Sequence, residues 1–295
     1  MLADLDLLLT TVFCAADDLL PDRAKNARRR LTDAEVVTLL VAQSLMGITS
    51  DRRFVRVARK QLIGLFSGLV GQSGLHKRRA HLSDAVELVM AALARECPGY
   101  WDDVVLVDST PVETARSRET VKRAGDSTLD DAIGNAAAYG YCRSHSRWFY
   151  GMRLHAVFAP DGTPRAAMLV GADRPEREIA LAMLPAALHG GELVIADKGY
   201  AGREFAHAVG ELGGTLLRPA RSNQPQTGPQ LAPIRQRIES IFWTCKELLC
   251  LERHGARTLH NLRARIAQRL LALTACVYLN HYLGRPTRAI ADLTA

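Results

Sequence analysis

The pattern of apolar and polar residues predicts a helical N-terminal part followed by a mixed α/β part. In the first part, Thr32 and Glu35 stand three residues apart just before the apolar run 36–43. This spacing is typical of a capping box at the start of a helix. A second helix start lies at Ser83. We therefore expect residues 1–98 to form an all-helical region.

The helical region also carries clusters of basic residues, namely Arg52, Arg53, Arg56, Arg59, Lys60 and the run 76–79. A basic helical region ahead of a catalytic domain favours recognition of DNA ends, for example by a helix-turn-helix. An amphipathic bundle that serves dimerisation explains the same pattern, because nothing in the sequence marks a recognition helix. Both interpretations stay open at this point.

After Pro98 and Gly99 the pattern changes to short apolar runs between polar segments. The expected elements are strands 104–107, 148–159 and 164–170, a helix 176–189, a strand ending at Asp197, a helix 203–212, a strand 215–217, a loop 219–233 and helical residues 234–283. Residues 109–147 are polar and irregular. This order of elements is that of a ribonuclease-H-like domain. The predicted fold class is α/β, a mixed sheet flanked by helices over residues 99–295.

One stretch of the C-terminal helical part places Arg235, Glu239 and Lys246 four and then seven residues apart. With 3.6 residues per turn, these side chains share one face of a helix. The other face is apolar and suits attachment to a core, through Ile238, Ile241, Phe242 and Cys245. A carboxylate between two cations is expected where a metal ion meets a nucleic-acid phosphate.

Two aspartates upstream, Asp108 and Asp197, each follow an apolar run. Strand ends hold carboxylates rigidly, and divalent cations such as Mg²⁺ prefer oxygen ligands. Two such ions activate a water or a 3′-hydroxyl and stabilise the leaving oxygen of an in-line displacement. Either aspartate alone is explained as well by a turn or a helix cap. Together with Glu239 they form a hypothesis for a metal site.

Four blocks of the sequence, 107–112, 150–155, 196–200 and the Arg235, Glu239, Lys246 spacing, resemble the DDE transposases of bacterial insertion sequences. The family's second acid is followed by any residue, a glycine and an aromatic residue, as Asp197 is here. Its third acid lies in a pattern of tyrosine, two residues, arginine, three, glutamate, six and lysine. Ala232 stands at the tyrosine position, so the accessory role of that tyrosine is in doubt.

The resemblance implies that Asp108, Asp197 and Glu239 are catalytic and bind Mg²⁺ or Mn²⁺, with two ions expected. It implies cleavage of a phosphodiester by water at the element's end, then attack of the freed 3′-hydroxyl on target DNA. Arg235 and Lys246 are expected to contact phosphates of double-stranded DNA, and a homodimer is the expected assembly. A nuclease that cuts without joining, and a non-catalytic DNA-binding protein derived from a transposase, are the alternatives.

Other candidates for DNA contact are Arg153 and Lys198, with Tyr200 expected to stack on a displaced base. His155 shares a strand face with Arg153 and is at least as well explained as a structural histidine. A third set, Arg263, Arg265 and Arg269, is expected to form a solvated helix face first and a DNA track second. Ser109 lacks the glycine pattern of a hydrolase nucleophile.

Charge and cysteine content narrow the class of protein further. The chain has 295 residues, a net charge of +7 and six cysteines without a C-x-x-C pair. Residues 100–230 hold more acidic than basic residues, and both flanks are basic. An acidic centre between basic flanks suits a carboxylate metal site bordered by phosphate-binding surfaces. With acidic residues at the N-terminus and no long uncharged apolar run, we expect a cytoplasmic protein with reduced thiols.

Overall fold

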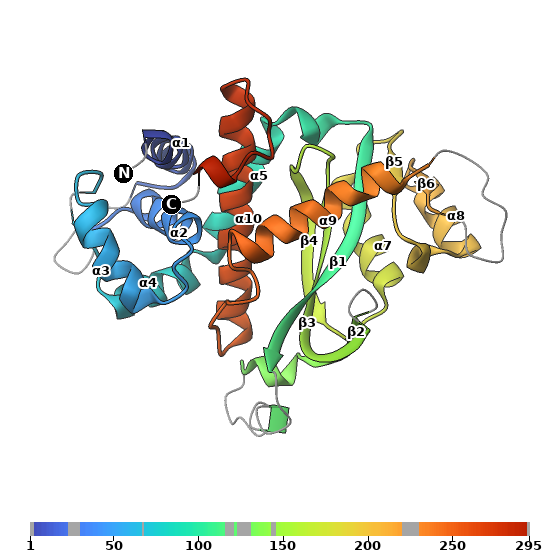
Figure 1. Cartoon of the computed structure of the whole chain (residues 1–295), viewed down its shortest axis with the longest axis horizontal. Coiled ribbons are helices and arrows are strands. Elements are labelled where there is room, and N and C mark those ends of the chain that lie inside the picture. The colour runs from blue at the N-terminus through green and yellow to red at the C-terminus, as the bar shows by residue number, and fades with distance from the viewer. Residues whose placement is uncertain are drawn as a thin grey trace. The chain divides into compact units, whose positions relative to one another are not determined.

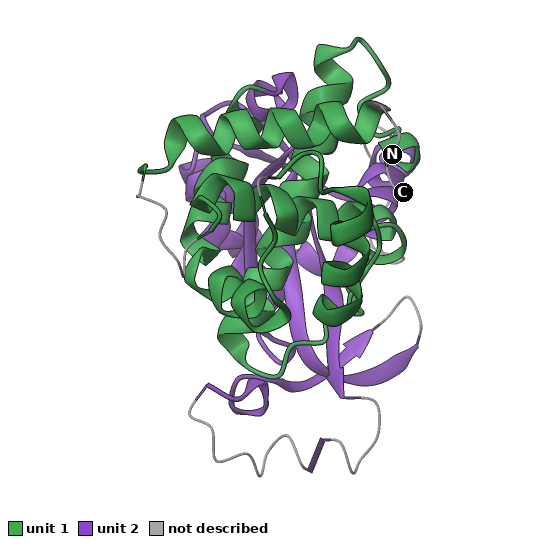
Figure 2. Cartoon of the chain, turned by 90° about the vertical axis from the view of Figure 1, so that its left-hand side faces the viewer, with its two compact units in different colours: residues 1–96, 243–295 green, residues 97–242 purple. Residues whose placement is uncertain are grey.

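The structure is a computed structural model that describes residues 3–22, 30–66, 68–115, 121–122, 131–142, 146–219 and 230–293. Its internal contacts divide the chain into two compact units, shown in Figure 2. The helical unit comprises residues 1–96 and 243–295, and the sheet unit comprises residues 97–242. The expected boundary near residue 98 agrees with this division. The C-terminal helical residues, which we expected in the domain 99–295, instead pack with the N-terminal helices.

The helical unit is built from α1 (Ala3–Leu19), α2 (Asp33–Leu45), α3 (Asp51–Gln61), α4 (Gln72–His81), α5 (Ser83–Arg95) and α10 (Leu259–Tyr282). Helix α10 is apolar on most of its circumference and packs against α1, α2, α4 and α5. The predicted capping box is confirmed at α2, where Thr32 Oγ1 accepts from the Glu35 N–H at 3.0 Å. Glu35 Oε2 accepts from the Thr32 N–H at 2.6 Å. Burial of α10 on all sides explains why it joins this unit.

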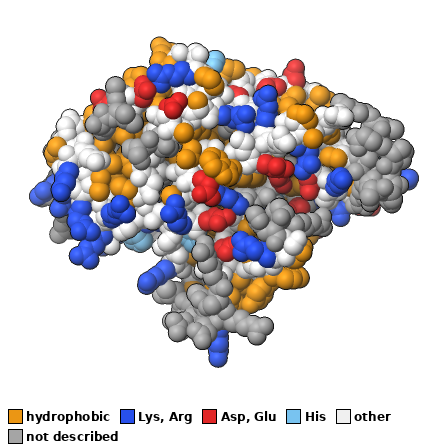
Figure 3. Space-filling view, viewed as in Figure 1, with side chains coloured by type: hydrophobic (Ala, Val, Ile, Leu, Met, Phe, Trp, Pro, Cys, Tyr) orange, Lys and Arg blue, Asp and Glu red, His pale blue; other side chains and the backbone are white. Residues whose placement is uncertain are grey.

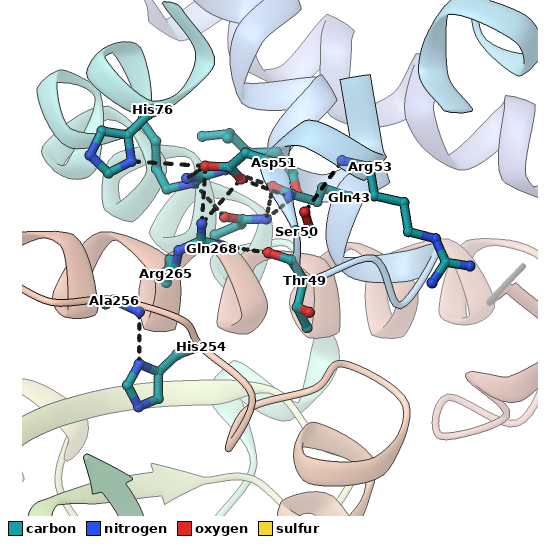
Figure 4. Close-up of polar contacts among 12 residues, drawn as sticks. Gln43, Thr49, Ser50, Asp51, Arg53, His76, His254, Ala256, Arg265 and Gln268 are labelled. Atoms are coloured by element: carbon teal, nitrogen blue, oxygen red, sulfur yellow. Dashed lines mark hydrogen bonds and ion pairs between the residues drawn. The ribbon is translucent and has the colours of Figure 1, made fainter. Parts of the chain in front are cut away.

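A buried ion-pair network crosses the helical unit around Asp51 (Figure 4). Arg79 is 0% exposed and donates to Asp51 Oδ1 at 2.8 Å and Oδ2 at 3.0 Å. Arg265 donates to both Asp51 oxygens at 3.1 Å. Gln43 and Gln268 complete the network through amide contacts with Asp51 and Arg79. Burial raises the pKa of Asp51, but Arg79 and Arg265 outweigh it and hold that pKa well below its usual range.

This network corrects two expectations about basic residues. Arg265 and Arg269 are buried instead of forming a solvated helix face. The run 76–79 is not a free basic patch, because Arg79 is buried and Arg78 donates to the carbonyls of Leu31 and Thr32. A sequence pattern shows helical spacing but not the acidic partner that a distant helix supplies.

Helix α3 does present a basic surface. Its buried side consists of Phe54, Val55 and Ala58. The exposed residues are Arg52, Arg53, Arg56, Arg59 and Lys60. Figure 3 shows Lys and Arg side chains gathered over this helix. The five exposed residues are called the α3 basic face below.

The sheet unit contains β1 (Val104–Ala115), β2 (Ala138–Cys142), β3 (Arg147–Phe158), β4 (Pro164–Gly171), β5 (Leu193–Ile195) and β6 (Thr215–Leu217). The order is β2-β3-β1-β5-β6, with β4 also paired to β3 (Figure 1). Strands β1 to β4 pair antiparallel, whereas β1, β5 and β6 pair in parallel. Helices α7 (Glu176–Ala187), α8 (Arg203–Glu211) and α9 (Ala232–Glu247) accompany the sheet. The mixed sheet flanked by helices confirms the predicted fold class.

Three details differ from the predicted elements. Strand β1 runs on to Ala115 and β2 lies within a segment that we took as irregular. The predicted helix 234–283 is two helices, α9 and α10, separated by a turn in which Cys250 has φ 55° and Thr258 caps α10. The predicted loop 219–233 lies largely outside the described residues. None of the described helices is long and apolar enough to cross a membrane.

Candidate active site

The parallel pairing of β1 and β5 brings Asp108 and Asp197 to one end of the sheet. Leu106 pairs with Ile195, and each strand reaches its aspartate two residues later. Asp108 Oδ1 accepts from the Ser109 N–H at 2.8 Å. Asp197 caps the short helix Lys198–Tyr200, because its Oδ1 accepts from the Gly199 N–H at 2.6 Å. Backbone hydrogen bonds therefore fix one oxygen of each carboxylate.

The two faces of the sheet give β1 different neighbours. Val105 and Val107 pack into the core formed with α7 and α8. Leu106 pairs with Phe158, whose ring lies 5.7 Å from Phe242 of α9. Because side chains alternate along a strand, Asp108 shares the face of Leu106 and Ser109 shares the face of Val107.

The charged form of Asp108 is disfavoured in this position. Burial raises its pKa to about 7, the negative charges of Asp197 and Glu176 raise it further, and the Ser109 N–H and Arg235 oppose the rise. These groups act on Asp108 only because they lie close to it. The site therefore has more negative charge than its own cations neutralise.

Gly199 explains why the sequence has glycine two residues after Asp197. A β-carbon added to Gly199 would lie 2.8 Å from Asp197 Oδ1 and 3.4 Å from Glu176 Oε2. The first distance is too short for any side chain, so only glycine lets the backbone pass so close to the carboxylates. The same contact shows that Glu176 reaches the turn that carries Asp197.

Glu176 is a site residue that we did not predict from the sequence. It is the first residue of α7, and its Oε1 accepts from Ser109 Oγ at 2.9 Å and from Arg153 Nη1 at 2.5 Å. In the sequence it follows Pro175 at a helix start, a place where an acidic residue is common for helix stability alone. No local signal distinguished it from such a residue.

Arg153 is engaged inside the protein. Its side chain is 12% exposed, and besides Glu176 it donates to Ser109 Oγ at 3.2 Å and to the Tyr141 carbonyl at 3.1 Å. Its neighbour on the same strand face, His155, is 0% exposed, and neither ring nitrogen has a partner among the described residues. Burial lowers the pKa of His155 to about 4, so the ring is neutral at pH 7.

Tyr200 is fully buried, which corrects the expectation that it stacks on a base. It is 0% exposed, and its ring lies 5.7 Å from that of Phe205. Its hydroxyl has no hydrogen-bond partner among the described residues. Burial raises the pKa of Tyr200 well above its usual value, and the charges of Asp108, Glu176 and Asp197 add to the rise.

The helix α9 has the faces that its sequence predicts. Ile238, Ile241, Phe242 and Cys245 are buried, Arg235 is half-buried and Glu239 is exposed. Lys246 Nζ lies 3.1 Å from Glu252 Oε1. Lys198, next to Asp197, is exposed.

The residues at the end of β1 and β5 suit a divalent cation. Within the described part of the chain, no three His, Cys, Asp or Glu side chains converge on a ready-made metal position, and Glu239 is not joined with the two aspartates in such a group. Mg²⁺ needs only one or two protein carboxylates when waters and phosphates complete its ligands. Asp108 and Asp197 supply hard oxygen donors and uncompensated negative charge, which is what such an ion requires.

Comparison with known sequences agrees with the sheet and its paired aspartates. Searches of curated proteins and of solved structures gave no significant match. The family model described as the transposase DDE domain matches residues 101–275, more than half of the chain. The match covers all six strands and most of α10. The chain therefore belongs to the family of transposase DDE domains.

Proposed function

We propose that the protein is an active transposase of a bacterial insertion sequence, which cleaves DNA at the ends of its element and transfers the strands to target DNA. The observation that carries the proposal is the convergence of Asp108 and Asp197 at the ends of two parallel strands, in a chain of this family. Because Asp108 has a pKa of about 7 in the metal-free protein, the pair favours a cation over a second proton-free charge.

Asp108 and Asp197 are the proposed ligands of Mg²⁺ or Mn²⁺, with Glu239 as the third acid of the catalytic set. When bound, such ions polarise the phosphate and lower the pKa of the attacking water or 3′-hydroxyl. Glu239 lies one helical turn from Arg235, whose positive charge already acts on Asp108. We infer that DNA draws Glu239 into the site, which fits the Arg, Glu, Lys spacing of the family.

The proposed DNA contacts divide by their surroundings. Arg235 and Lys198 lie beside the aspartates and suit phosphates of the reacting strand. Lys246 would have to exchange Glu252 for a phosphate. Arg153, which is tied to Glu176 and Ser109, is better suited to positioning than to DNA contact.

Double-stranded DNA is the proposed partner, and the cytoplasm is the proposed place of action. The α3 basic face supports a role of the N-terminal helices in holding element ends, since it presents five cations and no acidic residue on its exposed side. A homodimer, in which each protomer holds one element end, is the proposed assembly.

The proposal is tested by incubating the purified protein with DNA that carries the inverted repeats flanking its gene, in Mg²⁺ or Mn²⁺. Cleaved ends and joined products are expected, and both should disappear in Asp108→Asn, Asp197→Asn and Glu239→Gln while end binding persists. Asp103→Asn and Glu247→Gln are matched controls, because both residues are exposed and lie on the same elements as Asp108 and Glu239. Cleavage without joining would indicate a nuclease, and binding without cleavage would indicate a DNA-binding protein. Full strand transfer by any of the three variants would contradict the assignment.

A further inference from the structure

The two oxygens of Glu176 have different surroundings. Oε1 accepts hydrogen bonds from Ser109 and Arg153. Oε2 has no donor among the described residues and faces Gly199, next to Asp197 Oδ1. A carboxylate with one oxygen fixed by donors and the other free is the arrangement of a metal ligand held by its outer partners.

We propose that Glu176 is a further metal ligand of the active site, which binds a divalent cation through Oε2 together with Asp108 and Asp197. This inference rests on the proposed function, because it assumes a cation at the two aspartates. Asp108 approaches from the α9 face of the sheet, whereas Glu176 approaches from α7 at the turn after β5. The cation would thus bridge elements that the sequence keeps far apart.

Tyr200 gives an independent reason to expect a ligand at this place. Its hydroxyl is buried without a partner, although Asp108, Glu176 and Asp197 are all close enough for their charges to act on it. An unsatisfied buried hydroxyl costs about 1–3 kcal/mol, so it is rarely kept without a use. A cation that carries its own water molecules would give this hydroxyl a hydrogen-bond partner.

An ion pair that only stabilises the fold is the competing explanation for Glu176. In that case Arg153 is the purpose of the carboxylate, and removing the charge should affect stability but not cation binding. The position of Oε2 favours the ligand role, because an ion pair with Arg153 needs nothing from the oxygen that faces Asp197. The two explanations differ in one measurable quantity, the affinity of the full-length protein for a cation.

The test measures Mn²⁺ binding to the full chain without DNA, by titration followed with electron paramagnetic resonance. Glu176→Gln should weaken Mn²⁺ binding about tenfold or more, in the range seen when groups around a metal are removed. Glu178→Gln is the matched control, since Glu178 is exposed two residues further along α7 and should leave the affinity unchanged. Asp108→Asn should weaken binding at least as much as Glu176→Gln.

The outcomes separate this inference from the proposed function. If Glu176→Gln lowers the unfolding temperature but keeps the Mn²⁺ affinity, the carboxylate is a structural partner of Arg153 and the inference is wrong. If Asp108→Asn also keeps the affinity, the proposed metal centre itself is wrong. Should Glu176→Gln not fold, Glu176→Asp provides the test, because it keeps the charge and moves the oxygens by one methylene. Unchanged Mn²⁺ affinity in Glu176→Asp would then overturn the inference.

Discussion

Replacing Asp108 with asparagine should stabilise the metal-free protein while it abolishes activity. Burial raises the pKa of Asp108 from its ordinary 3.8 to about 7. A carboxyl with a raised pKa destabilises the folded state once it is ionised. This penalty is absent below the unfolded pKa, grows as the pH rises and is complete above about pH 7. Since each factor of ten in proton affinity is worth about 1.4 kcal/mol, the full penalty is about 4 kcal/mol.

The expected gain therefore depends on pH in a defined direction. Asp108→Asn should raise the free energy of unfolding of the sheet unit by about 4 kcal/mol at pH 8 and by about 1.5 kcal/mol at pH 5, both in a chelator. Hydrogen exchange with mass spectrometry suits the measurement, because peptides from β1 and β3 report on the unit that contains Asp108. Comparing variant and unmodified protein at the same pH removes the effect of pH on intrinsic exchange.

Two controls give this prediction its force. Asp103→Asn removes an exposed charge just before β1 and should change stability by less than about 0.5 kcal/mol at either pH. Adding Mg²⁺ should stabilise the unmodified protein and have little effect on Asp108→Asn, because the cation neutralises the charge that the variant lacks. A variant that is no more stable than the unmodified protein at pH 8 would refute the reasoning about charge in this site.

Three further predictions concern the helical unit. Asp51→Asn leaves the buried Arg79 and Arg265 without their carboxylate and should cost about 3–5 kcal/mol in urea unfolding followed by circular dichroism. Because burial is outweighed by these arginines and the pKa of Asp51 is held low, its contribution should persist above about pH 4 and fade as the pH falls further. Arg56→Ala should weaken binding of element-end DNA and reduce its salt dependence by about one ion in fluorescence anisotropy, whereas unchanged binding would remove the α3 basic face from the DNA interface. Thr32→Ala should cost about 1 kcal/mol in thermal unfolding through loss of the capping box, and no loss would show that another group replaces the cap.

Most elements of the fold could be predicted because their signals are local. The capping box at Thr32, the strand 215–217 and the apolar stripe of α9 all depend on residues within one element. The assignment of α10 to the helical unit could not be predicted, because it depends on which distant helices cover its apolar circumference. The burial of Arg265 has the same origin, since its partner Asp51 lies on another helix.

The candidate site was predictable to the extent that it follows strand ends. Asp108 and Asp197 come together because β1 and β5 are parallel neighbours in register, which the two apolar runs indicated. Glu176 was not predictable, because its role arises from contacts with Ser109, Arg153 and Gly199 on three other elements. Tyr200 was placed in the right motif but assigned the wrong surroundings.

The charge balance of the site links these observations to function. Near the end of β5, Asp108, Asp197 and Glu176 are close enough for their charges to act on Tyr200, and Arg153 is already paired with Glu176. An arrangement selected only for stability would neutralise the remaining charge with another arginine, as the helical unit does around Asp51. The sheet unit instead leaves Asp108 with a raised pKa and Tyr200 without a partner. Unsatisfied charge and polarity of this kind are stable only if something binds there, and a hydrated divalent cation satisfies both at once.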